Sequence, residues 1–212
     1  MKIEYLGHSC FRITDENGVS LLTDPYSGVG YELPPRLCAD IVTVSHGHFD
    51  HNATHLVKAE KVINAVGMYE TNGVKVVGIP SYHDEKYGAL RGENVVFKWE
   101  MDGLTICHFG DLGEPCNASL VEKIGKTDIL LIPVGGRYTI DAKGAKQFVD
   151  AIAPKIVIPM HYKPADGTID ITDAEEFLGF FDGVLRVGDA PVHITADEVT
   201  KGRKIIFMER KH

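Results

Sequence analysis

The chain has 212 residues, of which 44% are hydrophobic and 25% charged, as is typical of a globular protein with a substantial core. Its formal net charge is -8 and it has no block of Lys or Arg, so we expect no binding to nucleic acid. It begins MKIEYLGHSC, without a secretory signal, and has no apolar run long enough to span a membrane, so with its four cysteines reduced we expect a cytoplasmic protein.

The first quarter of the chain predicts short strands joined by turns. Apolar runs at 2–6, 10–13 and 19–24 are strand-like, and a loop rich in Pro, Gly and Tyr follows at 25–35. The run DIVTVS at 40–45 is typical of a strand buried on both faces. NATHLVKAE at 52–60 then predicts a helix, with Asn52 as its N-cap.

The remainder predicts a strand-rich middle followed by alternating strands and helices. Hairpin turns are expected at Asn72-Gly73 and Asp102-Gly103, and Thr172 is expected to cap the last helix. Strands are expected at 62–66, 74–80, 95–101, 104–111, 128–134 and 155–160, with further strands closing the chain, and helices at 118–125, 141–153 and 172–182. This order predicts two sheets packed face to face with helices outside, an α/β (α+β) four-layer αββα sandwich forming one domain over 1–212.

One short segment, SHGHFDHN at 45–52, concentrates metal-binding side chains. Residues two apart point the same way in an extended or turning segment, so His46 and His48 can reach one ion together. Asp50 and His51 follow where we expect the chain to turn into a helix, and they can face a second ion. Isolated loop histidines are often only solvated, but the HxHxDH spacing favours a metal site.

Other candidate ligands come at or just after the ends of predicted strands, where functional residues often lie. His83 follows the strand at 74–80, Asp111 ends the strand at 104–111, and His161 follows the strand at 155–160. With the four ligands of the loop they make seven, too many for one tetrahedral ion. Seven ligands suit two ions that share a bridging carboxylate.

These motifs resemble those of the metallo-β-lactamase superfamily, which has an αββα sandwich with two metal ions at one edge. HxHxDH at 46–51 is its signature, and the later His, Asp and His occur in the family's order. Further blocks resemble the branch of ascorbate-6-phosphate lactonase-like metal-dependent hydrolases; they are YLGHSCF, GALRGENVVF, CHFGDLG, PVGGRYT and IPMHYKP.

The resemblance implies a role for each metal ligand. The first ion would be held by His46, His48 and His83, and the second by Asp50, His51 and His161, with Asp111 bridging the two ions. Zinc is the expected metal, while manganese, iron and nickel suit the same donors.

The implied activity is hydrolysis of a small substrate such as a lactone, ester, amide or phosphoester. A hydroxide bridging the two ions would be the nucleophile, and the catalytic residues would be Asp50, which orients it and carries its proton, and Asp111 as the bridge. Two other interpretations stay open, an iron-dependent oxidoreductase on the same scaffold and a metal-binding protein without turnover.

Several cations near the expected site suggest that the substrate is an anion carrying phosphate or carboxylate. The candidate substrate contacts are Arg91, Arg137, Tyr138 and Lys163, and the loops at 26–37 and 84–93 are candidate lids. Two histidines are left open: His8 either supports the metal ligands or, as we favour, is a structural turn residue, and His108 either orients Asp111 or is structural. His55, His193 and His212 are expected to be structural or solvent-facing. The sequence does not decide between a monomer and a homo-oligomer.

Overall fold

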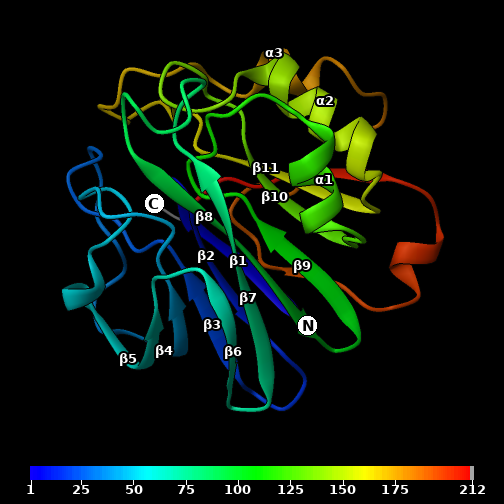
Figure 1. Cartoon of the computed structure of the whole chain (residues 1–212). Coiled ribbons are helices and arrows are strands. Elements are labelled where there is room, and N and C mark those ends of the chain that lie inside the picture. Colours follow the sequence, from blue (N-terminus) through cyan, green and yellow to red (C-terminus); the bar gives the residue numbers. More distant parts are fainter. Residues whose placement is uncertain (211–212) are drawn as a thin grey trace.

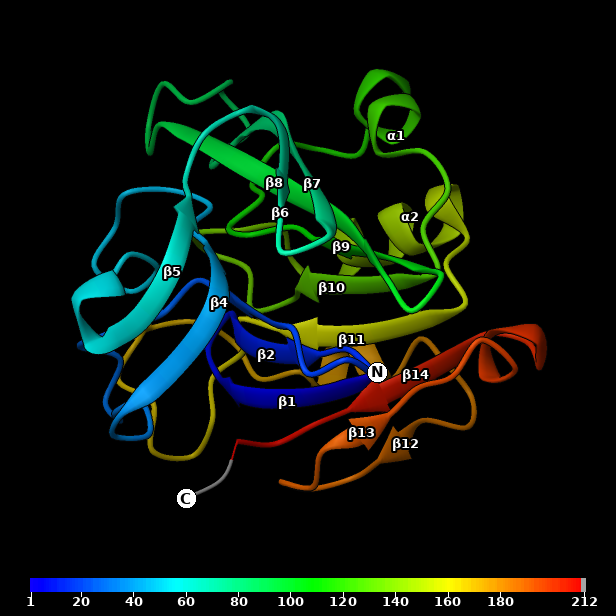
Figure 2. The ribbon, with the colours of Figure 1, turned by 90° about the horizontal axis from the view of Figure 1, so that it is seen from below.

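The computed structural model describes residues 1–210, so His212 and the end of the expected domain lie outside the described residues. Two β-sheets face each other (Figures 1 and 2). The first has six strands in the order β13-β1-β2-β3-β4-β5. Its strands are β1 (Lys2–Gly7), β2 (Cys10–Thr14), β3 (Ser20–Thr23), β4 (Leu37–Thr43), β5 (Val57–Ile63) and β13 (Val192–His193).

The second sheet has eight strands in the order β12-β14-β11-β10-β9-β8-β7-β6. Strands β6 to β9 form an antiparallel meander, and β9, β10, β11, β14 and β12 are parallel neighbours. Their bounds are β6 (Gly67–Thr71), β7 (Val74–Tyr82), β8 (Glu93–Met101), β9 (Leu104–His108), β10 (Ile129–Pro133), β11 (Ile156–Met160), β12 (Leu185–Arg186) and β14 (Lys204–Phe207).

Three α-helices cover the outer face of this second sheet (Figures 1 and 2). They are α1 (Ala118–Ile124), α2 (Ala142–Ile152) and α3 (Glu175–Leu178), and short 3-10 helices form at Thr54–Leu56 and Glu198–Thr200. Every residue of β10 and β11 is buried, as expected for parallel strands covered on both faces. Within residues 1–210, none of the helices is both long enough and apolar enough to cross a membrane.

The six-stranded sheet has a more polar outer face. Buried and half-buried side chains alternate along β1, and on the half-buried side Arg12 donates hydrogen bonds of 2.8 and 3.0 Å to Glu4. Among residues 1–210 no α-helix precedes β9, so the helical cover lies over the eight-stranded sheet.

The expected helix at 52–60 is wrong, and Asn52 is not a helix cap. The 3-10 turn Thr54–Leu56 begins after Ala53, and the chain then enters β5. Strand β5 pairs in parallel with β4, which brings Val57 opposite Leu37 and Val62 opposite Val42. Tertiary pairing therefore overrides the helix propensity of the Ala, Glu and Lys residues in this segment.

The last expected helix is also shorter than predicted, because α3 has four residues and no cap from Thr172. Thr172 instead donates hydrogen bonds from its backbone N–H and its hydroxyl to the carbonyl of Gly135, at 2.9 and 3.0 Å. The two hairpin turns are confirmed: Asn72-Gly73 and Asp102-Gly103 all have positive φ and join antiparallel neighbours.

Candidate metal centre

The ends of four strands deliver the predicted ligands to one edge of the sandwich. His46 lies in the loop after β4, and His83 directly follows β7. Asp111 lies in the loop after β9, and His161 directly follows β11. The structure brings all seven predicted ligands into one cluster, in which the candidate groups of metal-binding atoms share members.

One group consists of His46, His48 and His83. Their ligand atoms all lie within 4.8 Å of one another. His46 Nε2 lies 3.0 Å from His48 Nδ1, and the ring centroids of His46 and His83 are 4.6 Å apart. The residues expected to hold the first ion therefore converge.

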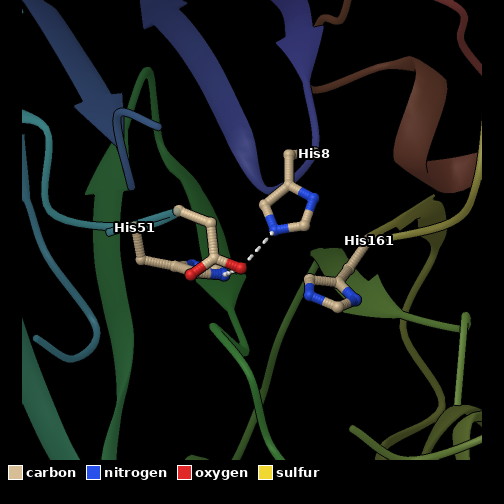
Figure 3. Close-up of side chains that lie close together, drawn as sticks. His8, His51 and His161 are labelled. Carbon is tan, nitrogen blue, oxygen red and sulfur yellow. Dashed lines mark ion pairs between the residues drawn. The ribbon is translucent and has the colours of Figure 1, made fainter. Parts of the chain in front are cut away.

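The second group contains Asp50, His51 and His161, together with His8, whose role the sequence left open between supporting the ligands and a structural turn. The ligand atoms of these four residues also lie within 4.8 Å of one another. Figure 3 shows His8, His51 and His161 arranged around one carboxylate, with the ion pair between His8 and Asp50 dashed.

Asp111 lies between the two groups and has an oxygen atom close to imidazoles of both. Its Oδ1 is 3.0 Å from His51 Nε2, and its Oδ2 is 3.2 Å from His161 Nε2 and 3.4 Å from His83 Nε2. Of the seven predicted ligands, it alone contacts members of both groups through two oxygens, which is the placement expected of a bridge.

The buried polar atoms at the centre fit a bound cation better than they fit each other. His51 Nε2 and Asp111 Oδ1 are close together, yet neither has a hydrogen-bond partner, because the atoms are not aligned as donor and acceptor. Buried polar atoms rarely stay unpaired, since an unmade hydrogen bond is costly. Two buried ligand-type atoms that lie close together without a hydrogen bond suit a shared metal site.

The electrostatics keep most ligands in their metal-binding protonation states. Burial lowers the pKa of His46 to about 3 and that of His8 to about 4, so both imidazoles are neutral near pH 7. Burial opposes ionisation of Asp111, but His161 and His51 hold the pKa of this carboxyl well below its usual range. Burial also disfavours charge on His51, but Asp111 and Asp24 raise its pKa, so metal binding at His51 competes with a proton.

Asp24 is a supporting residue that the sequence analysis missed. It is fully buried after β3, and its carboxylate accepts hydrogen bonds from His51 Nδ1, Ser45 N and Ser45 Oγ at 2.8, 2.8 and 2.5 Å. The bond from Nδ1–H leaves His51 Nε2 free as a ligand, as carboxylates behind metal-binding histidines do. The sequence feature that could have indicated Asp24 is its position at the end of the predicted strand VSLLTD.

Three residues of the centre have a left-handed backbone, which is uncommon for residues other than glycine. The φ angles are +53° at His8, +36° at Asp24 and +50° at His161. Such conformations persist where the surrounding structure enforces them, and they cluster at functional sites. His8 and His161 are also linked directly, because the N–H of His161 donates to the carbonyl of His8 at 2.8 Å.

A cavity of about 700 Å³ opens beside the centre, with Asp50, His83, Asp111 and His161 in its wall. Two of the four predicted substrate contacts, Arg91 and Tyr138, line it. The wall also contains Phe49, Thr168, Ile169 and Asp170.

The other two predicted substrate contacts do not line this cavity. Arg137 forms an ion pair with Asp170 and lines a neighbouring cavity, and Lys163 lies in the wall of two others, beside Tyr162.

The two loops predicted to act as lids differ in how they meet the cavity. The loop at 84–92 supplies Arg91, and the Asp84 carboxylate accepts hydrogen bonds from four of its backbone N–H groups, the closest being that of Arg91 at 2.7 Å. In the loop at 26–37, Tyr26 is buried and donates to the carbonyl of Leu6 at 2.6 Å, and no residue of this loop lines the cavity. Ligand-dependent movement of either loop stays a prediction.

The other histidines have simple roles. His108 Nε2 donates to the carbonyl of Ser9 at 2.9 Å and its Nδ1 accepts from the N–H of Gly110 at 3.2 Å, so it holds the backbone before Asp111 without touching that side chain. His55 and His193 are exposed.

Comparison with known proteins identifies the family. A family model described as the beta-lactamase superfamily domain matches residues 2–161. A UPF0173 metal-dependent hydrolase from Carboxydothermus hydrogenoformans is 30% identical over 91% of this chain and 100% of its own length. One from Thermoplasma acidophilum is 33% identical over 78% of this chain and 85% of its own.

Solved structures agree. A protein from Thermotoga maritima described as a Zn-dependent hydrolase of the metallo-beta-lactamase superfamily is 40% identical, with a TM-score of 0.84 over 99% of each chain. A metallo hydrolase from Ignicoccus hospitalis shares the fold, with 21% identity and a TM-score of 0.70. The expected fold and superfamily are confirmed: this chain belongs to the metallo-beta-lactamase superfamily and, within it, to the UPF0173 metal-dependent hydrolase family.

Proposed function

We propose that this protein is a binuclear metal-dependent hydrolase acting on a small substrate in the cytoplasm. The observation that supports this most is the position of Asp111, whose two carboxylate oxygens lie 3.0–3.4 Å from histidines of both ligand groups. A carboxylate shared in this way suits a pair of ions. Relatives named metal-dependent hydrolases and Zn-dependent hydrolase agree with the activity.

The proposed first ion is held by His46, His48 and His83, and the second by Asp50, His51 and His161. Asp111 bridges them. Imidazole nitrogen and carboxylate oxygen suit zinc, which is our first candidate, and also manganese, iron and nickel.

Two such ions, when bound, supply Lewis-acid catalysis by activating water and polarising a carbonyl or phosphoryl oxygen. The protein residues then have distinct tasks. Asp50 lies in the cavity wall with 14% of its side chain exposed, so it can reach both the centre and a substrate. Nearby His8 and His51 hold the pKa of Asp50 below the usual range despite burial, so this carboxylate is ionised and can bind an ion and accept a hydrogen bond from the attacking water. The further role proposed for Asp50 is to carry the proton of that water to the leaving group.

The cavity suits a substrate with an anionic group and an apolar part. Within residues 1–210, Arg91 is the cavity's basic side chain without an ion pair, whereas Asp170 is engaged by Arg137. The guanidinium of Arg91 lies 5.5 Å from the ring centre of Tyr138, and its N–H edge is available to a carboxylate or phosphate. Phe49 and Ile169 supply apolar wall. A phosphorylated or carboxylated lactone or ester fits these groups, in keeping with the resemblance to lactonase-like enzymes.

A panel assay tests the activity. Protein of known metal content should hydrolyse at least one class among lactones, carboxylic esters, thioesters and phosphodiesters, and chelation should abolish the turnover. Oxygen uptake is measured in the same samples. Metal-replete protein that turns over no member of the panel but consumes oxygen with a reductant would instead support an iron-dependent oxidoreductase.

The role of Arg91 is tested with matched anionic and neutral substrates. Arg91→Ala should lower kcat/KM by about tenfold to a hundredfold for the anionic substrate only, as expected for loss of a charged hydrogen bond. Lys163→Ala is the control, because Lys163 lies outside the cavity. Equal losses of kcat/KM on both substrates would contradict a role of Arg91 in anion recognition.

A further inference from the structure

We propose that His8 is a protein ligand of the second metal ion, which it coordinates through Nε2 beside Asp50, His51 and His161. This inference rests on the proposed binuclear site and adds to it a residue from a distant part of the sequence. The family-like ligand set contains no residue from the turn between β1 and β2, where His8 lies.

The first observation is a buried nitrogen that makes no hydrogen bond. His8 is 1% exposed, and its Nε2 is buried without a hydrogen-bond partner. The nearest carboxylate oxygen, Asp50 Oδ2, is 3.3 Å away and not aligned for a hydrogen bond. Figure 3 shows the His8 ring directed from its turn toward this carboxylate and the neighbouring imidazoles. The nitrogen therefore faces the ligand group, close to the Asp50 carboxylate but without a hydrogen bond to it.

The distances match those between neighbouring ligands of one ion. With metal–ligand bonds of about 2.0–2.1 Å, two ligand atoms of one ion lie between about 2.9 Å apart, at a right angle, and about 4.1 Å apart, when they are opposite each other. The separation of His8 Nε2 from Asp50 Oδ2 is 3.3 Å, and that of His51 Nε2 from the same oxygen is 3.9 Å. A third imidazole, that of His161, has its ring centre 4.2 Å from the His8 ring.

Three hydrogen bonds hold the backbone of His8 in this position. Its carbonyl accepts from Tyr5 Oη at 2.9 Å and from the N–H of His161 at 2.8 Å, and its own N–H donates to Tyr31 Oη at 3.1 Å. These bonds stabilise its left-handed φ of +53°, a conformation that is unfavourable for residues other than glycine. Because one bond joins it to His161, the two imidazoles are fixed relative to each other.

With His8 as a ligand, the two ions would have different numbers of protein donors. The first ion would have four protein donors, three histidines and a share of Asp111, besides the water that it activates. The second would have His8, Asp50, His51, His161 and a share of Asp111, a set that exceeds four donors. A higher coordination number at the second ion follows.

The experiment counts coordinated imidazoles in the cobalt-substituted protein by paramagnetic NMR. Each coordinated histidine gives one exchangeable, hyperfine-shifted ring N–H signal, so protein with two Co²⁺ should give six signals if His8 is a ligand, from His46, His48, His83, His8, His51 and His161. His8→Gln should lose one signal and weaken the second Co²⁺ by at least about tenfold in a competition titration. His108→Gln, which removes another fully buried histidine, should keep all six signals.

The outcomes separate the two proposals. Wild type with two Co²⁺ and five shifted signals overturns the role of His8 but leaves the binuclear site intact, as does a His8→Gln protein with an unchanged signal count. Weaker binding in His8→Gln without loss of a signal makes His8 a positioning residue for Asp50 and also overturns the ligand assignment. Wild type that binds fewer than two Co²⁺ overturns the binuclear site itself and this inference with it. The count in the wild type decides even if the variant does not fold.

Discussion

Asp24→Asn tests how the fold prepares His51 to bind metal. In the wild type the carboxylate accepts from His51 Nδ1–H and from both Ser45 donors, which keeps a proton on Nδ1 and leaves Nε2, facing Asp111, as the atom that gives up its proton to bind the ion. In the Asp24→Asn variant, an NH2 group replaces one of the two carboxylate oxygens. If this NH2 group faces Ser45 N, two hydrogen-bond donors lie about 2.8 Å apart, the length of the present hydrogen bond, and repel each other. We therefore expect the NH2 group to face His51 instead.

That orientation satisfies the amide but reverses the histidine. His51 must then accept through Nδ1 and carry its proton on Nε2, the atom needed by the ion. Metal binding has to restore the original tautomer against a donor–donor contact, and an unsatisfied buried donor costs about 1–3 kcal/mol. Loss of such a supporting carboxylate typically weakens metal binding about 10–100-fold, which is about 1.4–2.7 kcal/mol. We expect this loss for the second ion only.

The assay is competition with a chromophoric chelator, combined with thermal unfolding of the metal-free protein. Asp128→Asn is the matched control, because Asp128 is also a buried carboxylate but lies before β10 and accepts from Thr105 N at 3.0 Å. Metal-free Asp24→Asn should also lose some stability, because Asp24 helps to hold the proton on His51, so the affinities are compared at a temperature at which both proteins are folded. Wild-type affinity for both ions in Asp24→Asn would refute this reasoning.

Three further predictions concern single positions. Asp50→Asn should lower kcat by at least about a hundredfold, as for loss of a positioned acid-base group, and near-normal turnover with both metals bound would contradict its role. Gly135→Ala should lower the melting temperature and weaken the second ion, because the added Cβ would lie 2.2 Å from the carbonyl oxygen of His161; an unchanged melting curve would show that this contact relaxes easily. Asp84→Asn should speed tryptic cleavage after Lys86, because two of the four backbone hydrogen bonds to this carboxylate lose their acceptor, and equal cleavage rates would contradict it.

The metal cluster was predictable because its residues carry a local pattern. HxHxDH marks four candidate ligands by spacing alone, and the candidates His83, Asp111 and His161 lie at or after apolar runs that the structure confirms as strands. Strand ends on one edge of a sandwich lie close together, so the positions of these residues in the sequence were sufficient to predict that they cluster.

Asp24 and His8 were harder to find because their roles depend on contacts across the fold. Asp24 lies 27 positions before His51, and no spacing relates them. His8 reaches the site through a backbone bond to His161, which follows β11 in the other sheet and lies far along the sequence. The helix prediction for the segment 52–60 was wrong for a similar reason, since local propensity gives no information on the pairing of β5 with β4.

The most direct test of the two-metal account is the number of ions bound at equilibrium by the purified wild-type chain, measured by elemental analysis after metal loading and removal of free metal. We expect two per chain, with His83→Ala and His161→Ala each retaining one and Asp111→Ala weakening both. Hydrolytic activity measured in the same samples should appear only as the second ion binds. A wild type that never exceeds one tightly bound ion under metal-replete conditions would contradict the account.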